Sequence, residues 1–78
     1  LNQYESLISL QHGLCAICQR SQDKFDRAFD IDHDHNSGHI RGLLCRYCNV
    51  GLGHFEDNIE RLQATINYLQ QFANRRKK

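Results

Sequence analysis

Apolar residues gather near the two ends of this chain and leave a polar middle that is rich in Asp and His. Near the start, Tyr4, Leu7 and Ile8 recur at the three- and four-residue spacing of one helix face. This spacing predicts a short helix over residues 2–11. Gly13 is expected to end that helix, and the polar residues 21–27 are expected to form a loop.

A longer helix is predicted at the other end of the chain. Asp57 is followed three residues later by Glu60, as in a capping box at a helix start. An apolar stripe follows at helical spacing, made of Ile59, Leu62, Ile66, Leu69 and either Phe72 or Ala73. We expect this stripe either to pack on the first helix as core or to form the face of a homodimer.

The middle of the chain has the pattern of a β-hairpin. Phe29 and Ile31 alternate with acidic residues, which predicts a strand over residues 28–32. Residues 36–38, Asn-Ser-Gly, have the composition of a turn. Residues 40–44 are then expected to form the return strand.

Two Cys-x-x-Cys pairs flank the predicted hairpin, and the second pair is expected to open a short helix that ends at residues 51–53. The predicted order is helix, cysteine turn, hairpin, helix, helix. The length of 78 residues allows one domain at most, over residues 1–78. A chain this small buries little apolar surface and usually needs a metal, a disulfide or a partner to fold.

The cysteine pairs are typical of a closed structural zinc site, with Cys15, Cys18, Cys45 and Cys48 as its four ligands. Four thiolates complete a tetrahedral Zn²⁺ shell and leave no position for a substrate. Such a site contributes on the order of 10 kcal/mol to folding. Disulfides, a redox pair or an iron–sulfur cluster are the alternatives. The absence of an export signal favours thiolates in a reducing compartment, and hence a cytoplasmic protein.

A second, open site is predicted between the pairs, in the run Asp32-His33-Asp34-His35, together with Asn49, which follows the last cysteine. A carboxylate oxygen of Asp32 and the amide oxygen of Asn49 can bind a hard cation such as Mg²⁺ and leave room for water and phosphate. A neutral His33 can take a proton from an attacking water. Alone, each of these residues is more simply a polar loop residue or a helix cap. Their spacing from the cysteines favours a site.

Other polar residues near the run allow two interpretations. Arg41 either clamps a substrate phosphate or pairs with Asp30 or Asp34 to hold the hairpin. Asp34 either orients a neighbouring imidazole or is solvated. His12 is interpreted as structural. His39 is interpreted as a surface residue, with substrate binding as the alternative. For His54 the alternative to a structural or surface role is metal ligation.

Charge alone does not indicate a partner, because the formal net charge is only +1. Basic residues do cluster in the tail 74–78, and Arg41 and Arg46 flank the second cysteine pair. Such clusters can dock phosphates, although a solvated end explains the tail equally well. The sequence has no apolar run long enough to span a membrane.

In combination, these residues resemble the phage recombination endonuclease VII family, a branch of the His-Asn-His (ββα-metal) nucleases. The resemblance runs from Gly13 to about Leu69. The matching segments are Cys15-Ala16-Ile17-Cys18, residues 31–35 (Ile-Asp-His-Asp-His), residues 38–49 (Gly-His-Ile-Arg-Gly-Leu-Leu-Cys-Arg-Tyr-Cys-Asn), residues 51–53 (Gly-Leu-Gly) and Ile66-Asn67-Tyr68-Leu69.

The resemblance implies a small α+β domain stabilised by zinc, with a ββα-metal (HNH, treble-clef-like) hairpin and helix flanked by an N-terminal and a C-terminal helix. It implies a DNA endonuclease in which Asp32 and Asn49 bind catalytic Mg²⁺ or Mn²⁺. His33 would be the general base and His35 a supporting residue. Hydrolysis would leave a 5′-phosphate and a 3′-hydroxyl. The resemblance supports nicking or double-strand cleavage better than resolution of branched DNA.

Two rival functions are also compatible with the sequence. One is a zinc-stapled nucleic-acid-binding module without catalysis, and the other is a zinc-dependent protein-interaction module. Asp32, His33 and Asn49 occur together, which favours the nuclease, because neither rival needs all three. DNA is therefore the expected partner, and a homodimer would be needed to cut two strands.

Overall fold

The computed structural model describes the backbone of residues 3–76 and the side chains of residues 3–73. Its elements, in chain order, are α1 (Gln3–Leu10), the short 3₁₀ helix η1 (Gln22–Lys24), β1 (Asp30–His33), β2 (Ile40–Leu44), α2 (Arg46–His54) and α3 (Ile59–Arg76). The predicted element order and the small α+β class are confirmed. Asn2, predicted as helical, and the side chains of the basic tail 74–78 lie outside the described residues.

The end of α1 leads directly into the first cysteine pair. His12 and Gly13 both have left-handed φ angles, of 56° and 72°, and the Gly13 amide donates back to the Ile8 carbonyl at 2.9 Å. This is how many helices end, and glycine takes such a φ without strain. Leu14 and Ser21 then form an isolated antiparallel bridge that closes the turn carrying the cysteines.

β1 and β2 form an antiparallel hairpin with one irregularity. Asp32 pairs with Gly42, whereas His33 pairs with Ile40. Arg41 is therefore an extra residue in β2, as in a β-bulge, and bulges commonly redirect a side chain. β1 begins two residues later than predicted, at Asp30, and ends one residue later, at His33.

The core lies where the hairpin meets α1 and the cysteine turn. Its buried residues are Cys15, Phe29, Leu43, Leu44 and Cys45, with Tyr4, Leu7, Ile8 and Leu52 among those packed around them. Gln11 ties α1 to β2 because its side chain accepts from the Leu43 amide at 2.9 Å and donates to the Leu43 carbonyl at 3.0 Å. Two of the five core residues are cysteines, so stability depends on what they bind.

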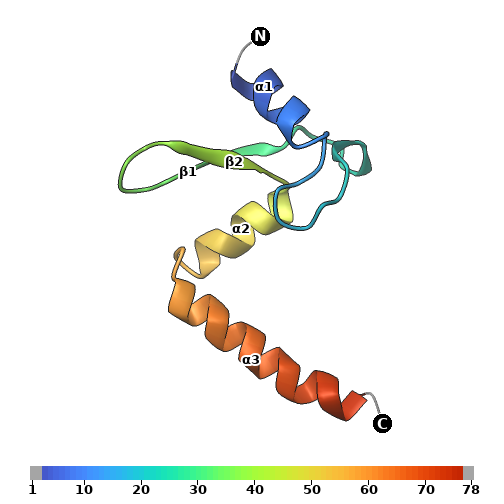
Figure 1. Ribbon diagram of the computed structural model, residues 1–78, viewed down its shortest axis with the longest axis vertical. Helices are drawn as coiled ribbons and strands as arrows, with labels where there is room; N and C mark the ends of the chain where they lie inside the picture. Colours follow the sequence, from blue (N-terminus) through green and yellow to red (C-terminus); the bar gives the residue numbers. More distant parts are fainter. Residues whose placement is uncertain (1–2, 77–78) are drawn as a thin grey trace.

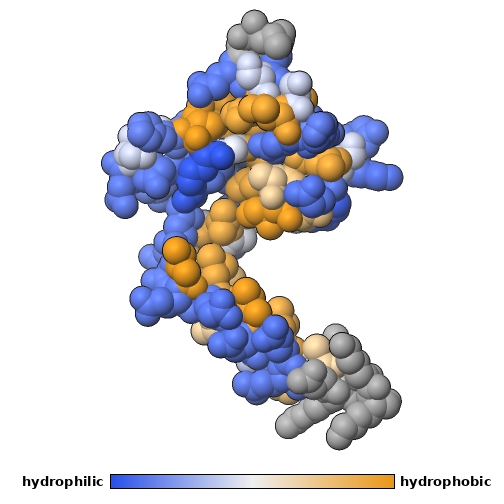
Figure 2. All heavy atoms as spheres, viewed as in Figure 1, coloured by the Kyte–Doolittle hydropathy of each residue, from blue (hydrophilic) through white to orange (hydrophobic). Residues whose placement is uncertain are grey.

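α3 projects away from the rest of the chain, and apolar side chains are exposed along it (Figures 1 and 2). Ile59 is 81% exposed and Leu69 is 60% exposed. The expectation that this stripe packs on α1 as core is therefore wrong. The turn before α3 explains the direction, since Glu56 and Asp57 both have left-handed φ angles, of 55° and 56°.

The predicted capping box at Asp57 is also wrong. Asn58 caps α3 instead, because its Oδ1 accepts from the Arg61 amide at 2.8 Å. Asp57 points its carboxylate to Arg41 of the hairpin, at 3.0 Å. None of the helices in residues 3–76 is both long enough and apolar enough to cross a membrane.

Candidate functional site

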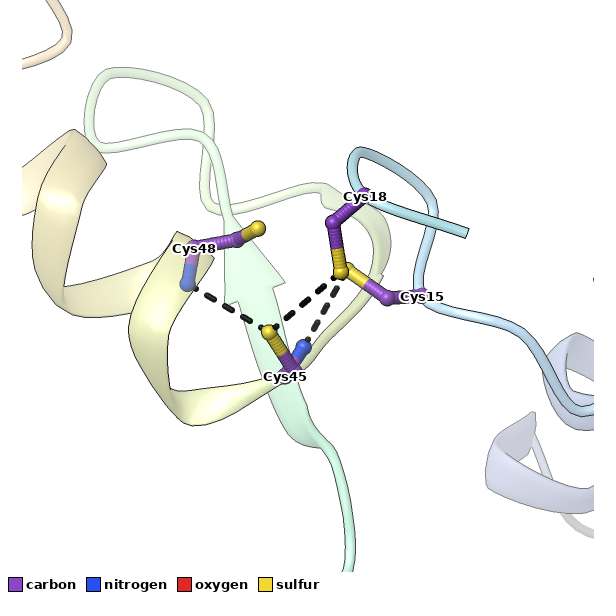
Figure 3. Close-up of side chains that lie close together, drawn as sticks. All are labelled: Cys15, Cys18, Cys45 and Cys48. Carbon is purple, nitrogen blue, oxygen red and sulfur yellow. Dashed lines mark hydrogen bonds between the residues drawn. The ribbon is translucent and has the colours of Figure 1, made fainter. Parts of the chain in front are cut away.

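The four cysteine sulfurs converge on one point. Cys15 and Cys18 come from the turn after α1, and Cys45 and Cys48 come from the start of α2 (Figure 3). All four Sγ atoms lie within 4.8 Å of one another, and the Sγ atoms of Cys18 and Cys45 are 3.8 Å apart. The Zn–S bond of about 2.3 Å implies a tetrahedral edge of about 3.8 Å. The cysteines are free thiols positioned to bind one metal ion, and this geometry fits zinc.

Local backbone structure holds the sulfurs in place. Cys45 is the N-cap of α2, and its Sγ accepts from the Cys48 amide at 3.5 Å. The Cys15 Sγ accepts from the Ile17 and Cys45 amides, at 3.5 and 3.4 Å. Amide donors stabilise negative charge on sulfur, as metal thiolates require.

Arg20 is the cation next to this cluster, and the sequence did not indicate it. Its Nε donates to the Cys18 Sγ at 3.1 Å, and its guanidinium lies over the rings of Phe25 and Tyr47. The hydrogen bond from Arg20 lowers the pKa of Cys18 to about 6. Burial, with the neighbouring thiols, raises the pKa of Cys48 to about 12. A metal must therefore displace a more firmly held proton from Cys48 than from Cys18.

Asn49 lies one residue after the last cysteine, on the side of α2 that meets β1. Its Nδ2 donates to the Oδ2 of Asp30 at 3.1 Å. Asp30 and Asp32 alternate with exposed residues in β1, so the two carboxylates share the face towards α2. Arg27 forms an ion pair with the other oxygen of Asp30. Two predicted site residues, Asp32 and Asn49, thus come from adjacent elements. Asn49 contacts Asp30, which shares a strand face with Asp32, and the polar residues on and around this face of β1 form a polar cluster.

Arg41 binds two carboxylates at once. Its Nε and Nη2 donate to Asp32 Oδ2 and Oδ1, at 2.7 and 3.0 Å, and Nη2 also reaches Asp57 Oδ2 at 3.0 Å. The bulge at Arg41 puts this side chain on the face of Asp32. The predicted acidic partners were Asp30 and Asp34, and the structure has Asp32 and Asp57 instead.

The two histidines of the run lie at the exposed edge of this cluster. The His35 Nδ1 is 3.9 Å from Asp57 Oδ2, and its side chain is 77% exposed. His33 is exposed at the end of β1. Among residues 3–73 its imidazole has no hydrogen-bond or ion-pair partner.

Asp34 holds the hairpin turn. Its Oδ1 accepts from the amides of Asn36 and Ser37, at 2.8 and 2.9 Å. These backbone hydrogen bonds lower the pKa of Asp34. This differs from both expected roles, orientation of an imidazole and simple solvation. The remaining histidines are exposed, and within the described part of the chain their side chains form no hydrogen bond: His12, His39 and His54.

Two carboxylates in the cluster were missed as site residues. Asp30 precedes Asp32 by two positions, and strand alternation alone could have placed both on one face. Asp57 was assigned to a helix cap, and no local signal indicates that it reaches Arg41 across the fold.

Comparison with known proteins identifies a family and two phage relatives of this chain. The family model described as recombination endonuclease VII matches residues 1–71. A Gene 59 protein of Mycobacterium phage D29 is 46% identical over 70 residues, which cover 88% of this chain and 42% of that protein. A Gene 59 protein of Mycobacterium phage L5 is 44% identical over 69 residues, which cover 87% of this chain and 42% of that protein. The chain therefore spans less than half the length of these relatives. The match over residues 1–71 confirms the resemblance seen in the sequence, and this chain belongs to the recombination endonuclease VII family.

Proposed function

We propose that this chain is a metal-dependent DNA endonuclease that hydrolyses phosphodiester bonds. The observation that carries the proposal is the contact between β1 and α2, where Asn49 donates to Asp30, and Asp32, held by Arg41, shares a strand face with Asp30. Membership of the recombination endonuclease VII family supports the same activity. The phage origin of two relatives is consistent with action in the cytoplasm of an infected cell.

In this proposal the hairpin and α2 form a ββα-metal (HNH) unit, with the cysteine cluster as its structural zinc site. The succession β1, β2, α2 supports this assignment. Zinc bound by four thiolates has no open position, so its role is to hold the cysteine turn after α1 against the start of α2. Asn49 comes directly after a cysteine ligand, and its place on the helix is therefore fixed by the cluster.

The catalytic cation would be Mg²⁺ or Mn²⁺, held by a carboxylate oxygen of Asp32 and the amide oxygen of Asn49. Carboxylate and amide oxygens suit hard divalent cations. The ion would stabilise negative charge on the phosphate. Arg41 donates to both oxygens of Asp32, so a cation bound by Asp32 would compete with Arg41 for the charge of this carboxylate. Asp57 gives Arg41 a second acceptor, and a substrate phosphate offers a third.

His33 supplies the general base in this mechanism. An exposed neutral imidazole can remove a proton from the attacking water near neutral pH. His35 stands beside Asp57 at the same edge and would support substrate binding. Cleavage of the P–O3′ bond by this route leaves a 5′-phosphate and a 3′-hydroxyl.

A plasmid assay tests the proposal. We expect the zinc-loaded chain to nick supercoiled DNA with Mg²⁺ or Mn²⁺, and EDTA to abolish nicking. His33→Ala should lose activity by roughly a hundredfold or more. His12→Ala is the matched control, since His12 is also exposed but lies far from the run in sequence. DNA binding without nicking by the wild type would instead identify a non-catalytic nucleic-acid-binding module. Comparison of a four-way junction with linear duplex then tests a preference for branched DNA.

We also propose that α3 pairs with α3 of a second copy. Ile59, Leu62, Ile66, Leu69 and Ala73 follow one another at alternating three- and four-residue intervals. This is the a/d spacing of a coiled coil, and Ile at a with Leu at d favours two strands. Exposure of the stripe supports the pairing. Two copies would supply the two sites that cleavage of both DNA strands requires.

A further inference from the structure

We propose that Asp30 is a positioning residue that fixes the side-chain amide of Asn49, so that Asn49 presents its oxygen to a divalent cation. The inference rests on the proposed function, because it assigns Asn49 as a cation ligand. The contact itself is independent of that assignment. Asn49 Nδ2 donates to Asp30 Oδ2 at 3.1 Å, and both side chains are partly buried.

The chemistry of the pair selects one orientation of the amide. The oxygen and nitrogen ends of a carboxamide have nearly the same shape, but only the oxygen can bind a cation. An ionised carboxylate accepts hydrogen bonds and cannot donate them. The reverse orientation would place two oxygens at the 3.1 Å now spanned by the hydrogen bond. Asp30 therefore holds the nitrogen and leaves the Asn49 oxygen free for a ligand role.

Both partners are anchored next to the cysteine cluster. Asp30 pairs with Leu44 in the hairpin, and Leu44 is buried directly before Cys45. The backbone amide of Asn49 donates to the Cys45 carbonyl at 3.0 Å. Arg27 holds the second oxygen of Asp30. The zinc site thus fixes the separation of the two side chains, and the amide orientation is set before any cation arrives.

A general electrostatic effect is the rival explanation, since any carboxylate near the site attracts cations. Two substitutions at Asp30 separate the hydrogen bond from the charge. Both remove the negative charge, but only one of them removes the hydrogen-bond acceptor. Asp30→Asn keeps a carbonyl oxygen that can accept from Asn49, and Asp30→Leu keeps the shape without an acceptor. Arg27 would compete for the single oxygen of the asparagine, so both are made in an Arg27→Ala background.

Affinity for Mn²⁺, measured by electron paramagnetic resonance on the zinc-loaded chain, is the first readout. We expect Arg27→Ala/Asp30→Leu to bind Mn²⁺ about tenfold or more weakly than Arg27→Ala/Asp30→Asn, as for other partners that orient metal ligands. Asp26→Asn, at an exposed acid of the preceding loop, is the control for charge and should bind like the wild type. Equal affinities of the two double variants would overturn the proposal. Zinc content and circular dichroism check that each variant is folded.

The side-chain NMR signals of Asn49 give a second readout that needs neither Mn²⁺ nor DNA. Asn49→Gln identifies the signals by their disappearance. We expect slow exchange of the Nδ2 protons with water in the wild type and faster exchange in Asp30→Leu. Unchanged exchange would overturn the positioning contact, even if a double variant failed to fold. Absence of Mn²⁺ binding by the wild type would overturn both this inference and the cation site of the proposed function. Mn²⁺ binding without DNA cleavage would overturn the proposed activity alone.

Discussion

Arg41 holds both carboxylate oxygens of Asp32, with its Nε 2.7 Å from Oδ2 and its Nη2 3.0 Å from Oδ1. The same Nη2 lies 3.0 Å from Asp57. Asp32 is the predicted carboxylate ligand of a catalytic cation, so Arg41 and that cation compete for the same atoms. Substitution of Arg41 or Asp57 should therefore change the affinity of the chain for a divalent cation.

Loss of Arg41 should separate cation binding from catalysis. Arg41→Ala frees both oxygens of Asp32, and we expect Mn²⁺ to bind up to about fivefold more tightly, in line with an exposed ion pair. DNA nicking should fall by roughly a hundredfold at saturating Mn²⁺, because a donor to the scissile phosphate is lost. Lys24→Ala removes an exposed cation of the 3₁₀ helix and is the control. Weaker Mn²⁺ binding by Arg41→Ala would show that Arg41 does not compete for Asp32.

Substitution of Asp57 should weaken Mn²⁺ binding, whereas Arg41→Ala should strengthen it. The effect of Asp57 should be exerted through Arg41. Asp57→Asn keeps a residue that tolerates the left-handed φ of 56° but replaces the second charged partner of Arg41 with a neutral acceptor. Arg41 then favours Asp32 over residue 57, and we expect Mn²⁺ affinity to fall severalfold. In an Arg41→Ala background the same substitution should have little effect. An equal loss in both backgrounds would mean that Asp57 acts by its charge and not through Arg41.

Retention of the structural metal should depend on Arg20 and on pH. Arg20 lowers the pKa of Cys18 to about 6, so protons compete for this thiolate mainly as the pH falls to that value. Arg20→Gln removes the main cause, and the Cys18 pKa rises towards its ordinary value of 9.0. We therefore expect zinc affinity at pH 7 to fall by roughly tenfold to a hundredfold. The midpoint of acid-induced zinc release should move to higher pH.

A zinc-sensitive dye followed along a pH titration measures that midpoint. Lys24→Gln removes an exposed cation from the neighbouring 3₁₀ helix without touching a sulfur, and it should leave the midpoint unchanged. A midpoint that is the same for Arg20→Gln and the wild type would refute the role of Arg20.

Removal of the metal should unfold the chain. Two of the five buried core residues are cysteines of the cluster, so the rest of the core cannot replace the metal. Structural zinc contributes on the order of 10 kcal/mol in small domains. We expect a strong chelator to abolish the cooperative thermal transition and added zinc to restore it. Cys45→Ser, which also alters the cap of α2, should show no such recovery. A Cys45→Ser variant with the wild-type Tm and one zinc per chain would contradict a four-thiolate site.

The sequence predicted the features that depend on local pattern. Period-two alternation and the Asn-Ser-Gly turn located the hairpin, and the spacing of the cysteine pairs brought four sulfurs together. It failed where distant residues compete for one side chain. Asp57 has the local signature of a cap, but Asn58 can cap the same helix, which leaves Asp57 for Arg41. Likewise, the apolar stripe of α3 predicts a buried face but does not identify what covers it.

Pairing of α3 with a second copy can be tested with one position on the stripe. Ile66 occupies an a position and is 47% exposed in the single chain. Ile66→Asp places a charge where two helices would meet, so we expect a dimer to become a monomer. Gln71→Asp places the same charge on the opposite side of α3, and it should leave the mass unchanged. Sedimentation equilibrium over a range of concentrations measures the mass of each variant.

The same pair of variants predicts how DNA is cut. If two sites act together, the wild type should convert supercoiled plasmid to linear product, whereas Ile66→Asp should accumulate nicked circles at the same rate of first cleavage. The reason is that His33 lies in β1 and Ile66 lies within α3, so the substitution leaves the proposed site of each copy intact. A wild-type chain that stays monomeric at all concentrations would refute pairing. Another segment would then have to cover the apolar stripe. The relatives do have further sequence beyond the matched region.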